Sequence, residues 1–107
     1  MKDIAGVKIL PEDKIKLTQE QKNLIELAFA KQVPPEDAEF IEKVQTEAKN
    51  EENSFVRLSA YFTKKYGLDF GMIYLSAIMD GKEKYQETVL LIEKSKAEKR
   101  IENLQKN

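Results

Sequence analysis

The chain has 107 residues, of which 41% are apolar and 35% are charged, and 18 basic residues nearly balance 19 acidic ones. This length suits a single domain with one small core. The chain contains neither Cys nor His, which excludes disulfides, thiolate metal sites, Cys nucleophiles and imidazole bases or ligands.

Residues 1–16 are predicted to form an extended N-terminal arm. Gly6 and Pro11 interrupt any helix there, and the apolar residues around them allow one short strand at Gly6–Leu10. Nothing else in the chain resembles a strand, and a lone strand leaves its backbone groups unpaired. The arm therefore either packs over the helices as irregular coil or pairs with another molecule.

Residues 17–107 are predicted to form a helical domain. A capping box at Thr18 and Gln21 opens its first helix, and the sequence at 33–35, Val-Pro-Pro, ends it. The second of these prolines suits the start of the next helix, and Asn53 or Ser54 is expected to cap the third. The helices are expected near residues 19–32, 35–49, 54–66, 69–80 and 82–105.

The third and fourth helices carry the strongest apolar signals. The third helix is expected to end at Gly67 and to bury the residues at its helical spacing, Phe55, Leu58, Phe62 and Tyr66. The fourth is expected to begin with Asp69 as its cap, and no charge follows before Asp80. A helix without a polar face is buried in a core or an interface, so the fourth helix is predicted to be central.

The last helix changes from apolar to highly charged along its length. In its second part, Ala97, Ile101 and Leu104 form a thin apolar stripe. Leu90, Ala97 and Leu104 lie seven residues apart, but Lys94 makes the heptad imperfect. The predicted fold class is an all-α, single-domain bundle of four to five helices with an extended N-terminal arm and a long charged C-terminal helix.

These features predict a small, non-catalytic protein that acts in protein–protein interaction or assembly through helix packing. The uncharged helix, the thin stripe and the unpaired arm each favour association with a protein partner or with a second copy. Aromatic and thioether side chains bring much apolar area to an interface. The candidate interface residues are Phe70, Tyr74, Leu75, Met79, Ala97, Ile101 and Leu104.

Nucleic-acid binding is the alternative function. Residues 62–74 have a pattern of helix and turn signals similar to a helix-turn-helix. The outward positions of its second helix would be Phe70, Gly71, Tyr74 and Leu75, and these side chains have few hydrogen-bond donors for bases. Phosphate contacts would then dominate. They would come from a modest basic patch, namely Arg57, Lys64, Lys65, Lys82 and Lys84.

The charges are unevenly distributed along the chain. Residues 35–52 hold seven acidic residues and two lysines, a balance of −5, whereas residues 53–82 have a balance of +2. The acidic segment is either a solvated helix face or a docking surface for a basic partner.

No pattern in the sequence indicates catalysis or a bound group. Asp69 and Asp80 would lie about 16 Å apart along one helix, too far to act together, and phosphate-loop, nucleophile-elbow and calcium-loop motifs are missing. We predict no enzymatic activity, no metal and no cofactor. No stretch approaches the roughly 20 apolar residues of a membrane span, and the first residues do not resemble a secretory signal, so we expect a cytoplasmic protein without membrane contact.

Overall fold

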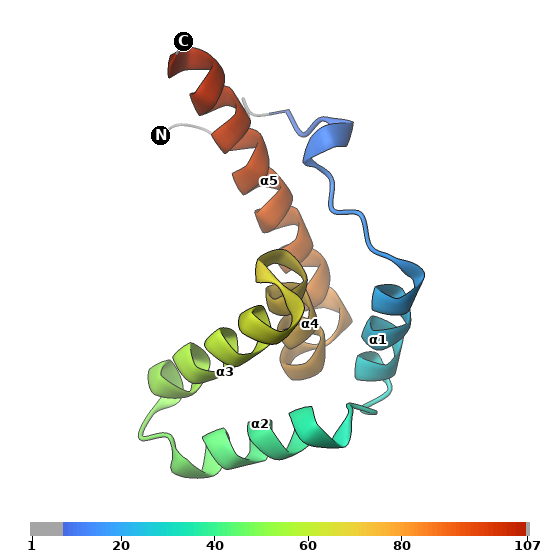
Figure 1. The fold of residues 1–107 in the computed structure, drawn as a ribbon, viewed down its shortest axis with the longest axis vertical. Helices are drawn as coiled ribbons and strands as arrows, with labels where there is room; N and C mark the ends of the chain where they lie inside the picture. Colours follow the sequence, from blue (N-terminus) through green and yellow to red (C-terminus); the bar gives the residue numbers. More distant parts are fainter. Residues whose placement is uncertain (1–7, 107) are drawn as a thin grey trace.

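The structure, a computed structural model, describes residues 8–106, and within them the chain forms five α-helices, one short 3₁₀ helix and no β-strand. Helix α5 is the longest, α4 packs against it, α1 and α3 pack against α4, and α2 packs against α3 (Figure 1). This confirms the predicted all-α, single-domain bundle. In chain order, the elements are η2 (Pro11–Asp13), α1 (Gln19–Phe29), α2 (Pro35–Glu47), α3 (Glu51–Tyr66), α4 (Leu68–Asp80) and α5 (Lys82–Lys106).

Side-chain caps mark the starts of α1 and α3. The Thr18 hydroxyl accepts a hydrogen bond from the Gln21 amide at 3.1 Å, and the Gln21 side chain accepts one from the Thr18 amide at 3.0 Å, which confirms the capping box. The expected cap of α3 at Asn53 or Ser54 is wrong. The helix begins three residues earlier because the Asn50 side chain accepts from the Asn53 amide at 2.8 Å.

Single glycines join α4 to its neighbours. Gly67 and Gly81 have φ of +98° and +93°, in the region that side chains of L-residues rarely adopt. The expectation that Asp69 caps α4 is wrong, since the helix begins at Leu68, directly after Gly67, with no side-chain cap. Asp69 lies in the first turn and forms an ion pair with Lys96 at 3.6 Å.

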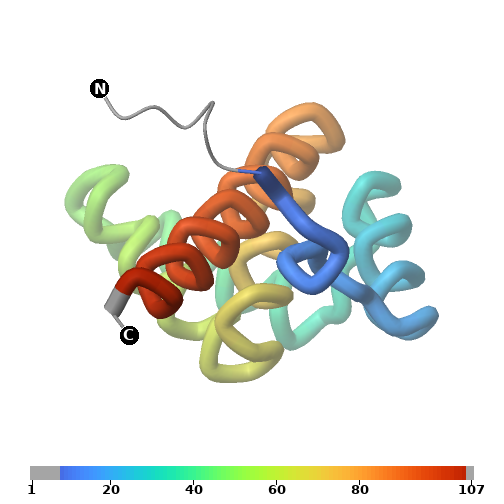
Figure 2. Tube along the Cα trace, turned by 90° about the horizontal axis from the view of Figure 1, so that it is seen from above, coloured from blue at the N-terminus to red at the C-terminus, as the bar shows by residue number. Residues whose placement is uncertain are grey.

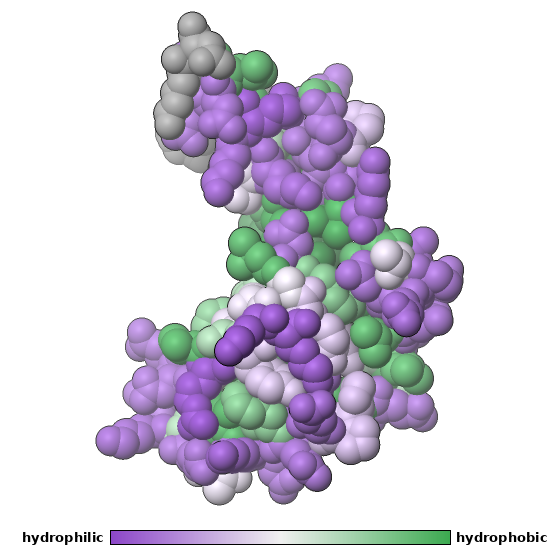
Figure 3. Space-filling view, in the orientation of Figure 1, coloured by the Kyte–Doolittle hydropathy of each residue, from purple (hydrophilic) through white to green (hydrophobic). Residues whose placement is uncertain are grey.

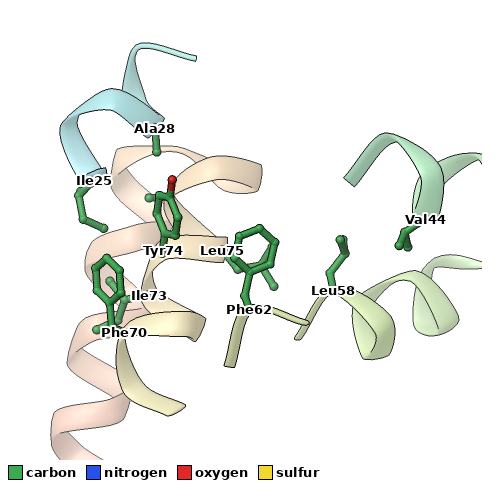
Figure 4. Packing of buried hydrophobic residues seen from close by; sticks show 10 residues of the cluster. Ile25, Ala28, Val44, Leu58, Phe62, Phe70, Ile73, Tyr74 and Leu75 are labelled. Atoms are coloured by element: carbon green, nitrogen blue, oxygen red, sulfur yellow. The ribbon is translucent and has the colours of Figure 1, made fainter. Parts of the chain in front are cut away.

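Helix α4 is the centre of the core. Its middle packs against α3, α5 and α1, and buried side chains of α1 and α3 point toward it (Figure 4). Its two ends are open, because Leu68 and Met79 are exposed, so the predicted burial of the fourth helix is confirmed for most of its middle and is wrong for its ends. The buried α4 residues are Phe70, Gly71, Ile73, Tyr74, Leu75, Ser76 and Ala77.

Gly71 brings α3 and α4 into backbone contact. A Cβ atom at this position would lie 2.5 Å from the Phe62 carbonyl oxygen and 2.7 Å from the Thr63 Cα. Any larger residue would have to push the two helices apart. The close approach explains why the aromatic side chains of α3 and α4 pack so densely, with the Phe62 and Tyr74 rings 5.8 Å apart.

The described part of the arm packs as irregular coil beside the second half of α5 (Figures 1 and 2). Of the strand expected at Gly6–Leu10, residues 6 and 7 lie outside the described residues, and residues 8–10 are irregular. The Arg100 guanidinium donates to the buried Asp13 carboxylate at 2.8 Å, and the Ile15 amide donates to Glu93 at 2.9 Å. Between these two contacts on α5, Ala97 is fully buried.

Candidate functional site

An open groove of about 620 Å³ lies where α3, α4 and α5 meet. Leu58 and Leu75 are buried and form its floor. Phe55 of α3, Met79 of α4 and Leu91 of α5 line its sides and are exposed to solvent. The groove is therefore an apolar surface to which three helices contribute.

Two of the apolar side chains that line this groove are more than half exposed. Phe55 is 55% exposed and Leu91 is 65% exposed. A single exposed apolar residue needs no explanation, but a contiguous apolar surface with a polar rim is typical of an interaction site. Figure 3 shows hydrophobic atoms (green) reaching the surface between hydrophilic ones on one face of the molecule.

The apolar surface continues along α4 toward its first turn. Met72 lines both the groove and a smaller hollow of about 260 Å³, which Leu68 and Ile92 also line. Methionine side chains adapt their shape to different neighbours. The groove and the smaller hollow therefore adjoin each other at Met72.

The rim of the groove is polar and carries more negative than positive charge. Glu51 and Asp80 contribute carboxylates and Lys84 contributes an ammonium group. Deeper in the groove, the Thr88 hydroxyl donates to the Ser76 hydroxyl at 3.0 Å, which joins α4 to α5. The groove therefore combines an apolar floor with charged groups at its rim.

The structure divides the predicted interface residues into two groups. Phe70, Tyr74, Leu75 and Ala97 are buried by the chain itself, and such a side chain contacts a partner only if the fold opens. Leu75 reaches the groove only as part of its floor. The accessible residues of the prediction are Met79 and Leu104, which are exposed, and Ile101, which is half-buried.

Two of the three exposed apolar side chains that line the groove were missing from the predicted interface. The expectation that Phe55 is buried is wrong, because it lies in the second turn of α3, at the rim of the groove. Leu91 follows Leu90 within the apolar start of α5. A run of adjacent apolar residues that covers more than one helix face is the sequence signal for a second apolar surface.

The predicted basic patch does not form one surface. Lys64 and Lys65 lie near the start of α4, whereas Lys82 and Lys84 follow its end, about 20 Å away along a 13-residue helix. Three of the five patch residues also have acidic partners, which reduces the charge available to phosphates. Arg57 pairs with Glu47 at 3.3 Å, Lys65 with Asp37 at 2.7 Å and Lys84 with Glu87 at 3.6 Å.

The helix-turn-helix interpretation also fails on geometry. Phe70, Gly71, Tyr74 and Leu75 would have to face outward on a recognition helix. All four are buried instead, because the helix they belong to is the centre of the core. We therefore do not propose nucleic-acid binding.

A buried polar cluster around Asp37 is the second notable site. Asp37 is fully buried on α2 and accepts hydrogen bonds from the Tyr61 hydroxyl at 2.7 Å, the Lys65 ammonium at 2.7 Å and the Tyr66 hydroxyl. All three donors belong to α3. The cluster therefore joins α2 to α3 across the side of the core.

The electrostatics of this cluster favour the ordinary charge state of each group. Burial raises the pKa of Asp37, but the hydrogen bonds from Lys65, Tyr66 and Tyr61 outweigh burial and hold the pKa below its ordinary value of 3.8. The hydrogen bond to Asp37 raises the pKa of Lys65 despite burial, and burial raises the pKa of Tyr74 to about 12. Near neutral pH, Asp37 and Lys65 therefore stay charged and Tyr74 stays neutral. Side chains that keep one charge state stabilise the fold and do not exchange protons.

The two aspartates that border the apolar stretch stay apart. Asp69 lies in the first turn of α4 and Asp80 is its last residue, so the helix separates their carboxylates, as expected. Among residues 8–106, no group of three or more acidic side chains is placed to hold a metal ion.

Comparison of the chain with family models, with curated proteins and with solved structures gives no match in any of the three. Within the described residues, no helix combines the length and apolar character needed to cross a membrane.

Proposed function

We propose that this protein is a non-catalytic interaction or assembly protein that self-associates by helix packing at the groove between α3, α4 and α5. The observation that carries the proposal is the convergence of Phe55, Met79 and Leu91 on one open apolar surface. A partner helix in the groove would remove all three side chains from water. The hydrophobic effect would then favour association.

The expected strength follows from the area that remains to be buried. Complete burial of a side chain of this size contributes about 1.5–3 kcal/mol, and these three are already about half buried. Covering them would contribute roughly 2–5 kcal/mol before any other contact. A millimolar complex corresponds to about 4 kcal/mol and a micromolar one to about 8 kcal/mol, so we expect association only at hundreds of micromolar to millimolar chain unless the apolar residues of the partner add to it.

Sedimentation equilibrium over that concentration range tests the proposal. The native chain should exceed its monomer mass of 12.4 kDa, and Phe55→Asp or Leu91→Asp should return it to the monomer mass. Val56→Asp is the matched control, because Val56 is 58% exposed on the same helix but does not line the groove. A native chain that stays monomeric at every concentration would contradict self-association.

A further inference from the structure

The near-neutral net charge conceals a separation of charge along the molecule. Residues 35–52, which include α2 and the first two residues of α3, have a balance of −5, whereas residues 94–106 of α5 hold five basic and two acidic residues. Figure 1 places α2 and the last turns of α5 at opposite ends of the long axis, which measures 46 Å. Two copies can therefore attract each other end to end.

The last turns of α5 project beyond the other helices, with only the arm beside them (Figure 1). We call residues 94–106 the α5 tip. Leu104 is 66% exposed, and Ile101, three residues earlier and on the same side of the helix, is half-buried. The α5 tip thus presents a small apolar surface within a basic segment.

The arm holds the α5 tip in a helical conformation before any partner binds. Arg100 within the tip donates to Asp13 at 2.8 Å and to the Lys8 carbonyl at 3.1 Å, and Glu93 accepts from the Ile15 amide at 2.9 Å. These contacts reduce the fraying expected at a helix end. A preorganised segment loses less conformational entropy when it binds.

The geometry and the charges point to one occupant for the groove: we infer that the α5 tip of a second copy lies in it. Leu104 and Ile101 would pack against the apolar sides of the groove, and Lys94 and Lys99 of the tip would lie near Glu51 and Asp80 at the rim. This inference rests on the proposed self-association and specifies its contact. Reciprocal exchange of two tips closes a dimer, whereas one-way exchange builds a chain of copies.

Complementation between two variants tests this contact. Leu104→Glu removes a tip residue and leaves the groove intact, whereas Phe55→Asp alters the groove and leaves the tip intact. Each variant alone should be monomeric. An equimolar mixture should form a heterodimer of twice the 12.4 kDa chain mass, because one native tip and one native groove remain. Leu27→Glu is the control, since Leu27 is exposed on α1, away from both surfaces, and should self-associate like the native chain.

The possible results separate the inference from the proposed function. If Phe55→Asp abolishes association but Leu104→Glu does not, another segment of the second copy occupies the groove, and only the inference fails. If the native chain is monomeric throughout, both fail. A mixture that stays monomeric would also overturn the inference, as would a dissociation constant that does not rise several-fold between low and physiological salt. Circular dichroism of each variant should show native helix content, so that lost association is not lost folding.

Discussion

Replacing the buried carboxylate of Asp37 tests the role assigned to the polar cluster. The change Asp37→Asn keeps the size of the side chain but removes its charge. It also removes one of the two oxygens that accept from Tyr61, Lys65 and Tyr66. The link between α2 and α3 should weaken, and the whole domain should become less stable because both helices contribute to one core.

The size of this effect follows from burial on the two sides of the ion pair. Removing one partner of a fully buried pair costs about 3–5 kcal/mol, since the other charge stays buried alone. Asp37 is fully buried, but the Lys65 side chain is 33% exposed and also lies 3.2 Å from Glu36. Lys65 can therefore recover water and an acidic neighbour. We expect a loss of about 2–4 kcal/mol, a large part of the roughly 5–15 kcal/mol that a domain has in total.

Urea unfolding at pH 7, followed by circular dichroism, measures this loss. Glu39→Gln is the matched control on α2, because Glu39 is exposed, and it should change stability by no more than about 0.5 kcal/mol. A loss below about 1 kcal/mol for Asp37→Asn would refute the reasoning. A loss that persists unchanged in a Lys65→Met background would refute the assigned pairing, since coupled residues are not additive.

Three further predictions concern pH, helix contact and the arm. The folded-state pKa of Asp37 is lowered, so the stability that it contributes is present above about pH 4 and lost as pH falls further; a urea midpoint unchanged by acid would contradict this. Gly71→Ala should lower the free energy of unfolding by at least about 1–3 kcal/mol, because the added Cβ meets the Phe62 carbonyl, although alanine has a better helix propensity than glycine. A higher melting temperature of the variant would contradict this. Arg100→Ala should speed amide exchange at Ile15 several-fold, and unchanged exchange would mean that the arm is held elsewhere.

Local signals were enough to predict much of the fold. The capping box at Thr18, the prolines before α2 and the glycine after α3 each act within a few residues, so the sequence around them indicates the helix ends. Asn50 was missed as a cap although its type suits that role. The apolar pattern of α3 begins only at Phe55, after a polar first turn, and the pattern alone does not say where that first turn begins.

The polar cluster lay beyond such reasoning because its members are distant in sequence. Asp37 lies 24 residues from Tyr61 and 29 from Tyr66, and on α2 it resembles any acidic residue of a helix N-terminus. Its burial becomes visible only when α2 packs against α3. The groove was missed for a related reason. Periodicity indicates that Phe55 shares a face with Leu58, but not whether a neighbouring helix extends far enough to cover it.

Ala97 and Leu104 show how the arm decides which part of the α5 stripe is available to a partner. The two residues lie seven apart and share one side of the helix, so the sequence gives them the same role. Ala97 is fully buried, however, whereas Leu104 is exposed. The difference follows from Arg100 and Glu93, whose hydrogen bonds hold the arm over the part of α5 that contains Ala97. The arm therefore covers the Ala97 end of this stripe and leaves only its other end, at the tip, accessible, which is the part that we infer to enter the groove.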